Sequence, residues 1–163
     1  MMDKDPTIIT RDEWQAPPIL QNMLIARLPV IYVFCMSTHT RACSNPEECH
    51  DLVHRLEKIH TEIHHHIAIR YNFVITGEGS IYEGRGWGVQ AMLPLRYTRY
   101  NDRSLVVGFM GDYLENTLPR LMKRRREELV QYGIKNKYIS ENFEAIQIFK
   151  QNGNKQEIVD FEV

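Results

Sequence analysis

The chain has 163 residues, 43% of them hydrophobic and 25% charged, which is enough for one domain with its own core. Its formal net charge of −1 argues against a protein that binds nucleic acid or another polyanion through bulk charge. No apolar run reaches the roughly 18 residues that a membrane span requires, and the start has no signal-peptide pattern. An anchor or a secretion signal is therefore expected to lie outside this sequence.

The first 29 residues are expected to form an irregular segment, because Pro17 and Pro18 favour an extended chain after Trp14. Residues 30–36 form a near-continuous apolar run, which predicts a strand covered on both faces. Cys35 lies inside this run and is interpreted as an inert buried thiol rather than a nucleophile.

A helix is predicted to follow Ser44 and Asn45, either of which can cap it, with Pro46 in its first turn. Apolar residues then recur at helical spacing for about four turns: Cys49, Leu52, Val53, Leu56, Ile59 and Ile63. Taken alone, Cys43 and Cys49 could be two buried thiols or a disulfide that closes a short loop.

Histidines gather where this helix ends, at His60, His64, His65 and His66. Neighbouring residues on a helix or strand point in different directions, so three in a row rarely converge on one metal ion. His60 and His64 could share a helical face, but no third ligand accompanies them. A solvated or groove-lining cluster is favoured over a metal site.

The run from Arg70 to Gly88 predicts a β-hairpin followed by a tight backbone. Residues 71–76 alternate as a strand does, and residues 80–83 return after a loop in which Gly77 and Gly79 are expected to supply positive φ angles. The exit packs three glycines around Arg85 and Trp87, which indicates close backbone approach with the tryptophan as a wall.

Three further elements are predicted in the second half. Residues 104–110 read as a buried strand, and residues 145–150 as another. A helix is expected to open at Pro119 and to stop at Gly133, with four residues facing inward: Leu121, Met122, Leu129 and Val130. Residues 123–126 are a basic block, interpreted as a solvated helix face because two glutamates follow it.

The hairpin sequence YNFVITGEGSIYEGRGWGV resembles the central hairpin of the peptidoglycan recognition protein family, whose members share a fold with bacteriophage zinc amidases. The resemblance runs from about Thr7 to Phe149. It implies a single α/β domain, residues 1–163, with a mixed central sheet of about five strands flanked by helices. Residues 1–29 then match the family's N-terminal segment, a contact surface for other proteins in relatives, and residues 150–163 form a divergent C-terminal hairpin.

The resemblance also implies a Cys43–Cys49 disulfide and hence an oxidising compartment. Family members with amidase activity hold zinc with two histidines and a later cysteine. The corresponding places here are Met36 and Ile148, and no cysteine follows Cys49. Tyr71 matches a tyrosine that assists hydrolysis in active relatives, but without the metal it cannot generate hydroxide. We therefore expect no catalytic residues, no metal, no cofactor and no enzymatic activity.

The resemblance gives the other candidates a place at the ligand groove. His60 matches a groove histidine, and residues 64–66 match positions that discriminate the third amino acid of the peptidoglycan stem. The His65-His66 pair is neither the glycine-tryptophan pair of diaminopimelate readers nor the asparagine-phenylalanine pair of lysine readers. The remaining groove candidates are Tyr71, Trp87, Leu93, Asn101, which follows a three-residue insertion, and Arg103, which could hold a carboxylate or simply be a surface arginine.

Together these residues predict a non-catalytic recognition domain of innate immune signalling, in the extracellular part of a cell-membrane protein. The favoured role is a regulator or decoy receptor with an altered or closed groove, whose partners are other recognition-family receptors. The alternative is a receptor that binds diaminopimelate-type peptidoglycan fragments directly. An active zinc amidase is the weakest hypothesis, and nucleic acid is not expected as a partner.

Overall fold

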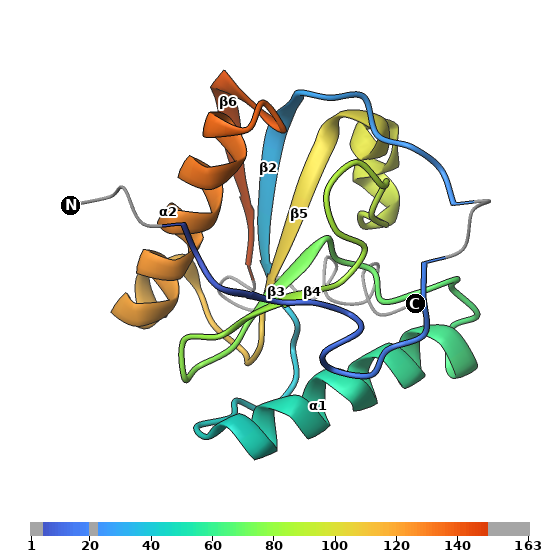
Figure 1. Ribbon diagram of the computed structural model, residues 1–163, viewed down its shortest axis with the longest axis vertical. Coiled ribbons are helices and arrows are strands. Elements are labelled where there is room, and N and C mark those ends of the chain that lie inside the picture. Colours follow the sequence, from blue (N-terminus) through green and yellow to red (C-terminus); the bar gives the residue numbers. More distant parts are fainter. Residues whose placement is uncertain (1–4, 20–22, 150–163) are drawn as a thin grey trace.

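The computed structural model describes residues 5–19 and 23–149, and within them six strands form one mixed sheet in the order β1-β4-β3-β5-β2-β6 (Figure 1). The β3–β4 hairpin is antiparallel and every other pairing in the sheet is parallel. The strands are β1 Ile8–Ile9, β2 Val30–Ser37, β3 Phe73–Ile75, β4 Ile81–Glu83, β5 Ser104–Phe109 and β6 Ile139–Ile148. The predicted α/β fold with a mixed sheet is confirmed. The additional strand is the two-residue β1, which is too short for a sequence pattern to reveal.

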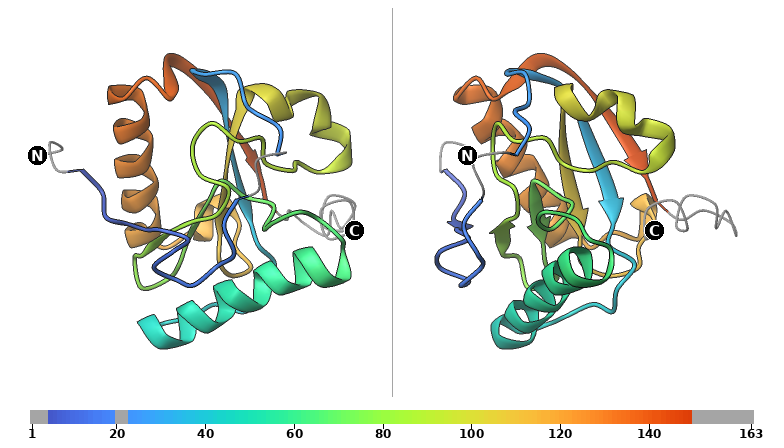
Figure 2. Two further views of the ribbon diagram at one scale, coloured as in Figure 1. Left: turned by 45° about the vertical axis from the view of Figure 1, so that its right-hand side comes forward. Right: turned by 90° about the vertical axis from the view of Figure 1, so that its right-hand side faces the viewer.

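Helices α1 (Pro46–Lys58) and α2 (Arg120–Lys135) pack on opposite faces of the sheet (Figures 1 and 2). The position of strand β2 between the two helices explains why its sequence is apolar throughout. Phe34 and Met36 belong to the core on the α1 side, and Val33 and Cys35 belong to the core on the α2 side. Successive side chains of a strand point to opposite faces, so a central strand between two helical layers buries all of them.

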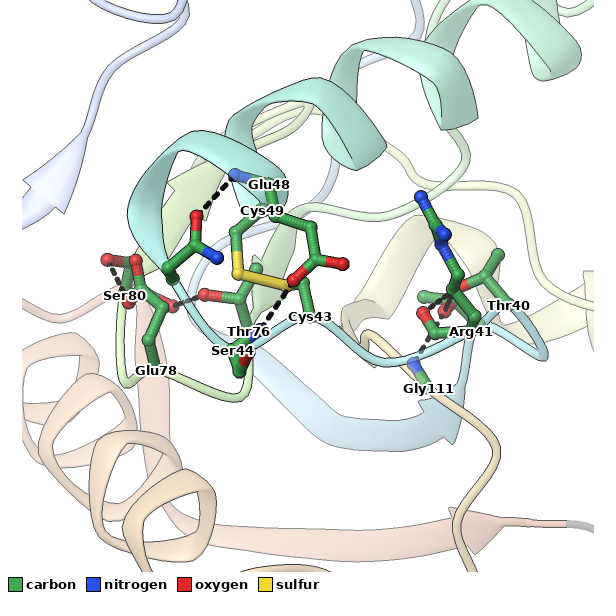
Figure 3. The surroundings of a disulfide bond; sticks show 12 residues. Thr40, Arg41, Cys43, Ser44, Glu48, Cys49, Thr76, Glu78, Ser80 and Gly111 are labelled. Atoms are coloured by element: carbon green, nitrogen blue, oxygen red, sulfur yellow. Dashed lines mark hydrogen bonds between the residues drawn. A yellow bond between two sulfur atoms is a disulfide. The ribbon is translucent and has the colours of Figure 1, made fainter.

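The start of α1 is fixed by side-chain caps and by a disulfide (Figure 3). The backbone N–H of Glu48 donates to Oδ1 of Asn45 at 2.9 Å, and the N–H of Ser44 donates to Oε1 of Glu48 at 3.0 Å. The disulfide joins Cys43 to Cys49, as the resemblance implied. The first turn of the helix is therefore held to the segment that leaves β2.

The hairpin turn packs against this disulfide loop. Gly79 has a φ of +94°, as predicted, but Gly77 is not among the residues with positive φ. Gly77 is required for a different reason, because a Cβ there would lie 2.6 Å from the carbonyl oxygen of Cys43. Close backbone contact between distant segments leaves no sequence signal beyond the glycine itself.

Two irregular helical segments extend the regular elements on the α1 side. The π-helical turn η1 (Ile59–Ile63) continues α1, and the 3₁₀ segment η2 (Leu95–Arg103) contains the insertion noted in the sequence. Within η2, the rings of Tyr97 and Tyr100 lie 5.7 and 6.0 Å from the ring of Phe34, and Tyr100 lies 5.0 Å from Tyr32. The insertion therefore covers part of β2 with aromatic side chains.

The predictions for α2 and β6 need three corrections. Gly133 lies inside α2 and does not stop it; a Cβ there would meet Ile139 and Trp87, so the glycine permits close packing. Leu121 is 36% exposed rather than inward. Strand β6 begins at Ile139 rather than at residue 145, because its pairing with β2 is interrupted by an irregularity that hides the strand pattern.

Two further predictions concern Cys35 and residues 150–163. Cys35 is a free, buried thiol, and burial raises its pKa to about 11. The predicted hairpin of residues 150–163 lies outside the described residues. Among the helices in the described part, none combines the length and the hydrophobicity that crossing a membrane requires.

Removing the disulfide in a Cys43→Ser/Cys49→Ser variant is expected to lower the free energy of unfolding by about 2 kcal/mol, because the bridge closes a short loop in the unfolded chain. Urea unfolding followed by circular dichroism measures this loss. A Cys35→Ser variant serves as the control for loss of a thiol without a bridge. An unchanged midpoint in the double variant would show that the bridge does not stabilise the fold.

Candidate functional site

The two places that the resemblance assigns to zinc ligands lie side by side and are filled by buried side chains. Met36 on β2 and Ile148 on β6 are partners in the strand register, and both belong to the buried core on the α1 side. Tyr71 is buried in the same core. The resemblance therefore selected residues that the fold does bring together, although they are far apart in sequence.

These residues do not fit a zinc ion. Zinc in proteins is bound by thiolate, imidazole or carboxylate groups, whereas Met36 offers a thioether and Ile148 offers a hydrocarbon. The ring of Tyr71 packs against Gly108 of β5, where a Cβ would lie 2.9 Å from the ring. In the part of the chain that the structure describes, no three His, Cys, Asp or Glu residues are grouped so that they could hold a metal ion.

A pocket of about 220 Å³ lies next to this core, and we call it the histidine pocket. It brings together three of the predicted groove residues, His65, His66 and Asn101, with the buried Arg85 at its wall. Its other lining residues are mostly apolar: Met23, Leu24, Ile67, Gln90, Ala91 and Met92. His60 lies beneath, with its ring 6.2 Å from that of His66 and 5.8 Å from that of Tyr71.

Two buried arginines make the surroundings of the pocket cationic. The Arg85 guanidinium donates to three backbone carbonyls, those of Ile69 at 2.7 Å, Gln90 at 2.9 Å and Ala68 at 3.2 Å. Arg70 is also buried, and its backbone N–H donates to Nδ1 of His60 at 3.1 Å. Backbone carbonyls position the Arg85 guanidinium without neutralising it.

The pKa values of the pocket reflect burial and this positive charge. Burial and the neighbouring Arg70 lower the pKa of His60 to about 3 and that of His66 to about 4. Burial and Arg70 also lower the pKa of Arg85 to about 10. At neutral pH both imidazoles are therefore uncharged while the arginines keep their charge, so the pocket favours an anionic or carboxylate-bearing group.

Glu57 of α1 is the one buried carboxylate in the described residues. It is not dedicated to the two buried arginines of the pocket. It pairs with Arg11 of the N-terminal segment at 2.6 Å and accepts the backbone N–H of Ile69 at 3.1 Å. Arg11 also donates to the carbonyl of Gly84 at 3.0 Å. This ion pair thus joins the N-terminal segment, α1 and the exit of the hairpin behind the pocket.

The backbone and the rim of the pocket are unusual as well. His65 has a φ of +62°, and it follows the π-helical turn η1; both features cluster at functional sites in proteins. Leu24 and Ile67 at the rim are 69% and 51% exposed. The rim of the pocket therefore exposes apolar area to solvent.

The other predicted groove residues lie elsewhere. Trp87 belongs to the α2 side of the sheet, where its ring stacks 4.6 Å from that of Tyr138. Leu93 is buried in the core and donates its N–H to Oδ1 of Asn101 at 3.0 Å. Arg103 is at the surface beside Asp102, with 3.6 Å between Nε and Oδ1.

Sequence reasoning missed Arg70 and Arg85 as members of the site. Arg85 had one available signal, its position between Gly84 and Gly86, where a Cβ would meet Tyr71 and Glu83 respectively. Glycines on both sides let the chain bend so that the guanidinium turns inward. Arg70 had no such signal, because an arginine before a strand is ordinarily exposed.

The family model described as N-acetylmuramoyl-L-alanine amidase matches residues 27–157. The chain belongs to this family, and within it to the peptidoglycan recognition protein domains related to amidases. Among curated relatives, a peptidoglycan-recognition protein of Drosophila melanogaster is 29% identical over 139 residues, which cover 85% of this chain and 74% of the relative. Peptidoglycan recognition protein 1 of Mus musculus is 27% identical over 140 residues, with the same two shares covered.

Among the solved structures similar to this chain at 25% identity or more, two contain tracheal cytotoxin. Peptidoglycan recognition protein-LE in complex with tracheal cytotoxin, a monomeric diaminopimelic acid-type peptidoglycan, is 28% identical with a TM-score of 0.81. The match covers 91% of this chain and 85% of that one. The tracheal cytotoxin-bound ectodomain complex of recognition proteins LCa and LCx gives 25% identity and a TM-score of 0.80, over 86% and 83% of the chains.

Replacing His60 with glutamine is expected to flatten the acid dependence of stability. The unfolded chain takes up a proton below about pH 6.5, whereas folded His60 stays neutral until about pH 3. The contribution of His60 to the free energy of unfolding is therefore complete above pH 6.5. It decreases as the pH drops, by up to about 1.4 kcal/mol per pH unit.

Urea unfolding between pH 7 and pH 4 measures this slope in the wild type and in His60→Gln. His50→Gln, which changes a histidine of α1 outside the pocket, should keep the wild-type slope. Equal slopes in the wild type and His60→Gln would contradict the assignment of the acid sensitivity to His60.

Proposed function

We propose that this domain is a non-catalytic peptidoglycan recognition protein of innate immune signalling that works as a regulator or decoy receptor. Its groove is altered so that it binds muropeptide weakly or not at all, and it acts through contacts with other recognition-family receptors. The observation that carries this proposal is the packed set of Met36, Tyr71 and Ile148 at the place of the amidase zinc site.

The loss of catalysis follows from the donor groups. An amidase of this family needs a metal-bound water as its nucleophile, and a thioether beside a hydrocarbon cannot hold the ion that lowers the pKa of that water. Tyr71 is buried within the core, where it packs rather than faces substrate. The domain is therefore expected to release no product from a muropeptide, with or without added zinc.

The change of the groove has separate support. The tyrosines of η2 cover Phe34 and Tyr32 of β2, and Leu93 is buried in the core instead of lining a cleft. The histidine pocket of about 220 Å³ is smaller than the roughly 300–1,000 Å³ of common small-molecule sites. A cavity of this size fits one or two side chains of a partner protein better than a peptidoglycan fragment.

A role in receptor contacts is supported by the surface around that pocket. Leu24 and Ile67 expose apolar area on the rim, and Arg85 and His66 give the interior a preference for a carboxylate. A relative in this fold, recognition protein LCa, forms an ectodomain complex with recognition protein LCx. We infer a similar association of this domain with a recognition-family receptor.

A second candidate function is direct recognition of diaminopimelate-type peptidoglycan. One observation favours it, since Arg85, His66 and Asn101 in one pocket could contact a stem-peptide carboxylate. For either function we propose an extracellular location at the cell membrane. The Cys43–Cys49 bridge supports it, because disulfides persist in oxidising compartments.

Isothermal titration with a monomeric diaminopimelate muropeptide separates the two functions. The isolated domain should give no binding under conditions in which recognition protein-LE, the positive control, is saturated. Titration of the domain into a recognition-family receptor ectodomain should give binding with and without muropeptide. Micromolar or tighter muropeptide binding by the isolated domain would favour the second candidate and reject the regulator hypothesis.

The surface that makes the contact can be tested with charge variants of the pocket rim. Leu24→Asp and Ile67→Asp should abolish receptor binding, because each removes apolar contact area and presents a negative charge to a carboxylate-bearing partner. Leu121→Asp changes an exposed leucine on α2, on the other side of the sheet, and should bind as the wild type does. Equal losses in all three variants would argue against a contact through the pocket.

A further inference from the structure

A second group of histidines lies outside the histidine pocket, on helix α1. His50 and His54 are four residues apart on the helix, and their ring centroids are 5.0 Å apart with 38° between the planes. Both side chains are partly exposed. Residues at this spacing share one helical face, and two histidines so placed can bind one metal ion, as they do in the zinc-binding His-Glu-x-x-His helices.

The ring separation agrees with joint coordination of one ion. With a metal–nitrogen distance of about 2.0–2.1 Å, an imidazole centre lies roughly 3.2 Å from the ion, so two rings at a tetrahedral angle have centres about 5.2 Å apart. The measured 5.0 Å is close to this value. The spacing of the two rings is therefore compatible with one ion between them.

The histidines of the pocket do not offer an equivalent site, although they are more numerous. The rings of His60, His64 and His66 are 6.2 to 6.4 Å apart, about 1 Å wider than the separation expected for tetrahedral coordination. Nδ1 of His60 accepts the backbone N–H of Arg70, so in the neutral ring the proton is on Nε2. Burial beside Arg70 and Arg85 also disfavours a cation there.

Negatively charged residues on α1 favour a cation at His50 and His54. Glu47 lies three residues before His50, and Asp51 lies three residues before His54, so each histidine has a carboxylate within one turn. Arg55 and Arg41 lie on the same side of the molecule as these acids, but both are exposed to solvent. His50 is already the fifth residue of α1, beyond the first turn where the helix dipole repels cations most.

We propose that His50 and His54 form a binding site for a divalent transition-metal ion of the Zn²⁺, Ni²⁺ and Cu²⁺ class. Nitrogen ligands suit these ions, whereas Mg²⁺ and Ca²⁺ prefer oxygen. Water completes the coordination, since no third side chain in the described residues joins the group. The site is separate from the amidase zinc place at Met36 and Ile148, and it holds whether or not the proposed regulatory function is correct.

Trp14 provides a direct reporter for this site. Its ring centroid is 5.4 Å from that of His54 in an edge arrangement, whereas Trp87, the second of the two tryptophans, lies in the core on the other face of the sheet. Bound Cu²⁺ quenches the fluorescence of a tryptophan this close. Titration of the domain with Cu²⁺ should therefore quench Trp14 with one equivalent of ion, and EDTA should restore the signal.

The variant His50→Asn tests the assignment, because it removes one ligand and leaves the contact between His54 and Trp14 in place. Loss of a direct ligand should weaken binding by more than about tenfold, the smallest effect of losing a mere supporting group. His66→Asn, in the pocket, should keep the wild-type affinity. Quenching that persists in His50→Asn, or that disappears in His66→Asn, would overturn the proposal.

A second measurement does not depend on fluorescence. Zn²⁺ or Ni²⁺ at about 100 times its dissociation constant should favour the folded state by about 100-fold and raise the melting temperature of the wild type. The melting temperature of His50→Asn should rise by less than that of the wild type, and Mg²⁺ should have no effect on either protein. An absence of any shift in the wild type, together with an absence of Cu²⁺ quenching, would equally overturn the proposal.

Discussion

The buried ion pair between Arg11 and Glu57 is the contact on which the rest of the site depends. It is the point where the N-terminal segment, α1 and the exit of the β3–β4 hairpin meet, and Glu57 also fixes the backbone at Ile69. Breaking a buried pair from one side costs about 3–5 kcal/mol, because the remaining charge loses its compensation. The segment that leads to the histidine pocket therefore has a fixed path, and the only carboxylate buried in the described residues is already engaged.

That engagement sets the chemistry of the pocket. Glu57 is committed to Arg11, and burial together with the nearby Arg70 lowers the pKa of Arg85. Because their pKa values are lowered, His60 and His66 remain uncharged at neutral pH, which keeps their desolvation cost low. On α1 the neighbouring charge has the opposite sign, since solvated carboxylates lie beside His50 and His54. Two histidine groups in one domain thus suit ligands of opposite charge.

The place that the resemblance assigns to the zinc of amidases is part of the buried core. Neighbouring strands still hold Met36 and Ile148 together, with Tyr71 in the same core. Zinc ligands are costly to bury without their ion, whereas burial of methionine and isoleucine side chains stabilises the fold. The partner contact proposed above falls on the exposed rim of the histidine pocket, on the same side of the sheet as these apolar residues and the tyrosines of η2.

The sequence by itself determined the fold class, the hairpin, the disulfide and the apolar residues at the amidase zinc place. These follow from local periodicity, turn chemistry and the resemblance carried by residues 71–89, which need no knowledge of distant contacts. The tertiary structure decided which groove candidates meet: His65, His66 and Asn101 line one pocket, whereas Trp87 lies on the other side of the sheet. It also turned Arg85 inward and gave Gly77 its role beside Cys43. Packing between segments that are far apart in the sequence fixes these positions, and the sequence does not contain the distances between such segments.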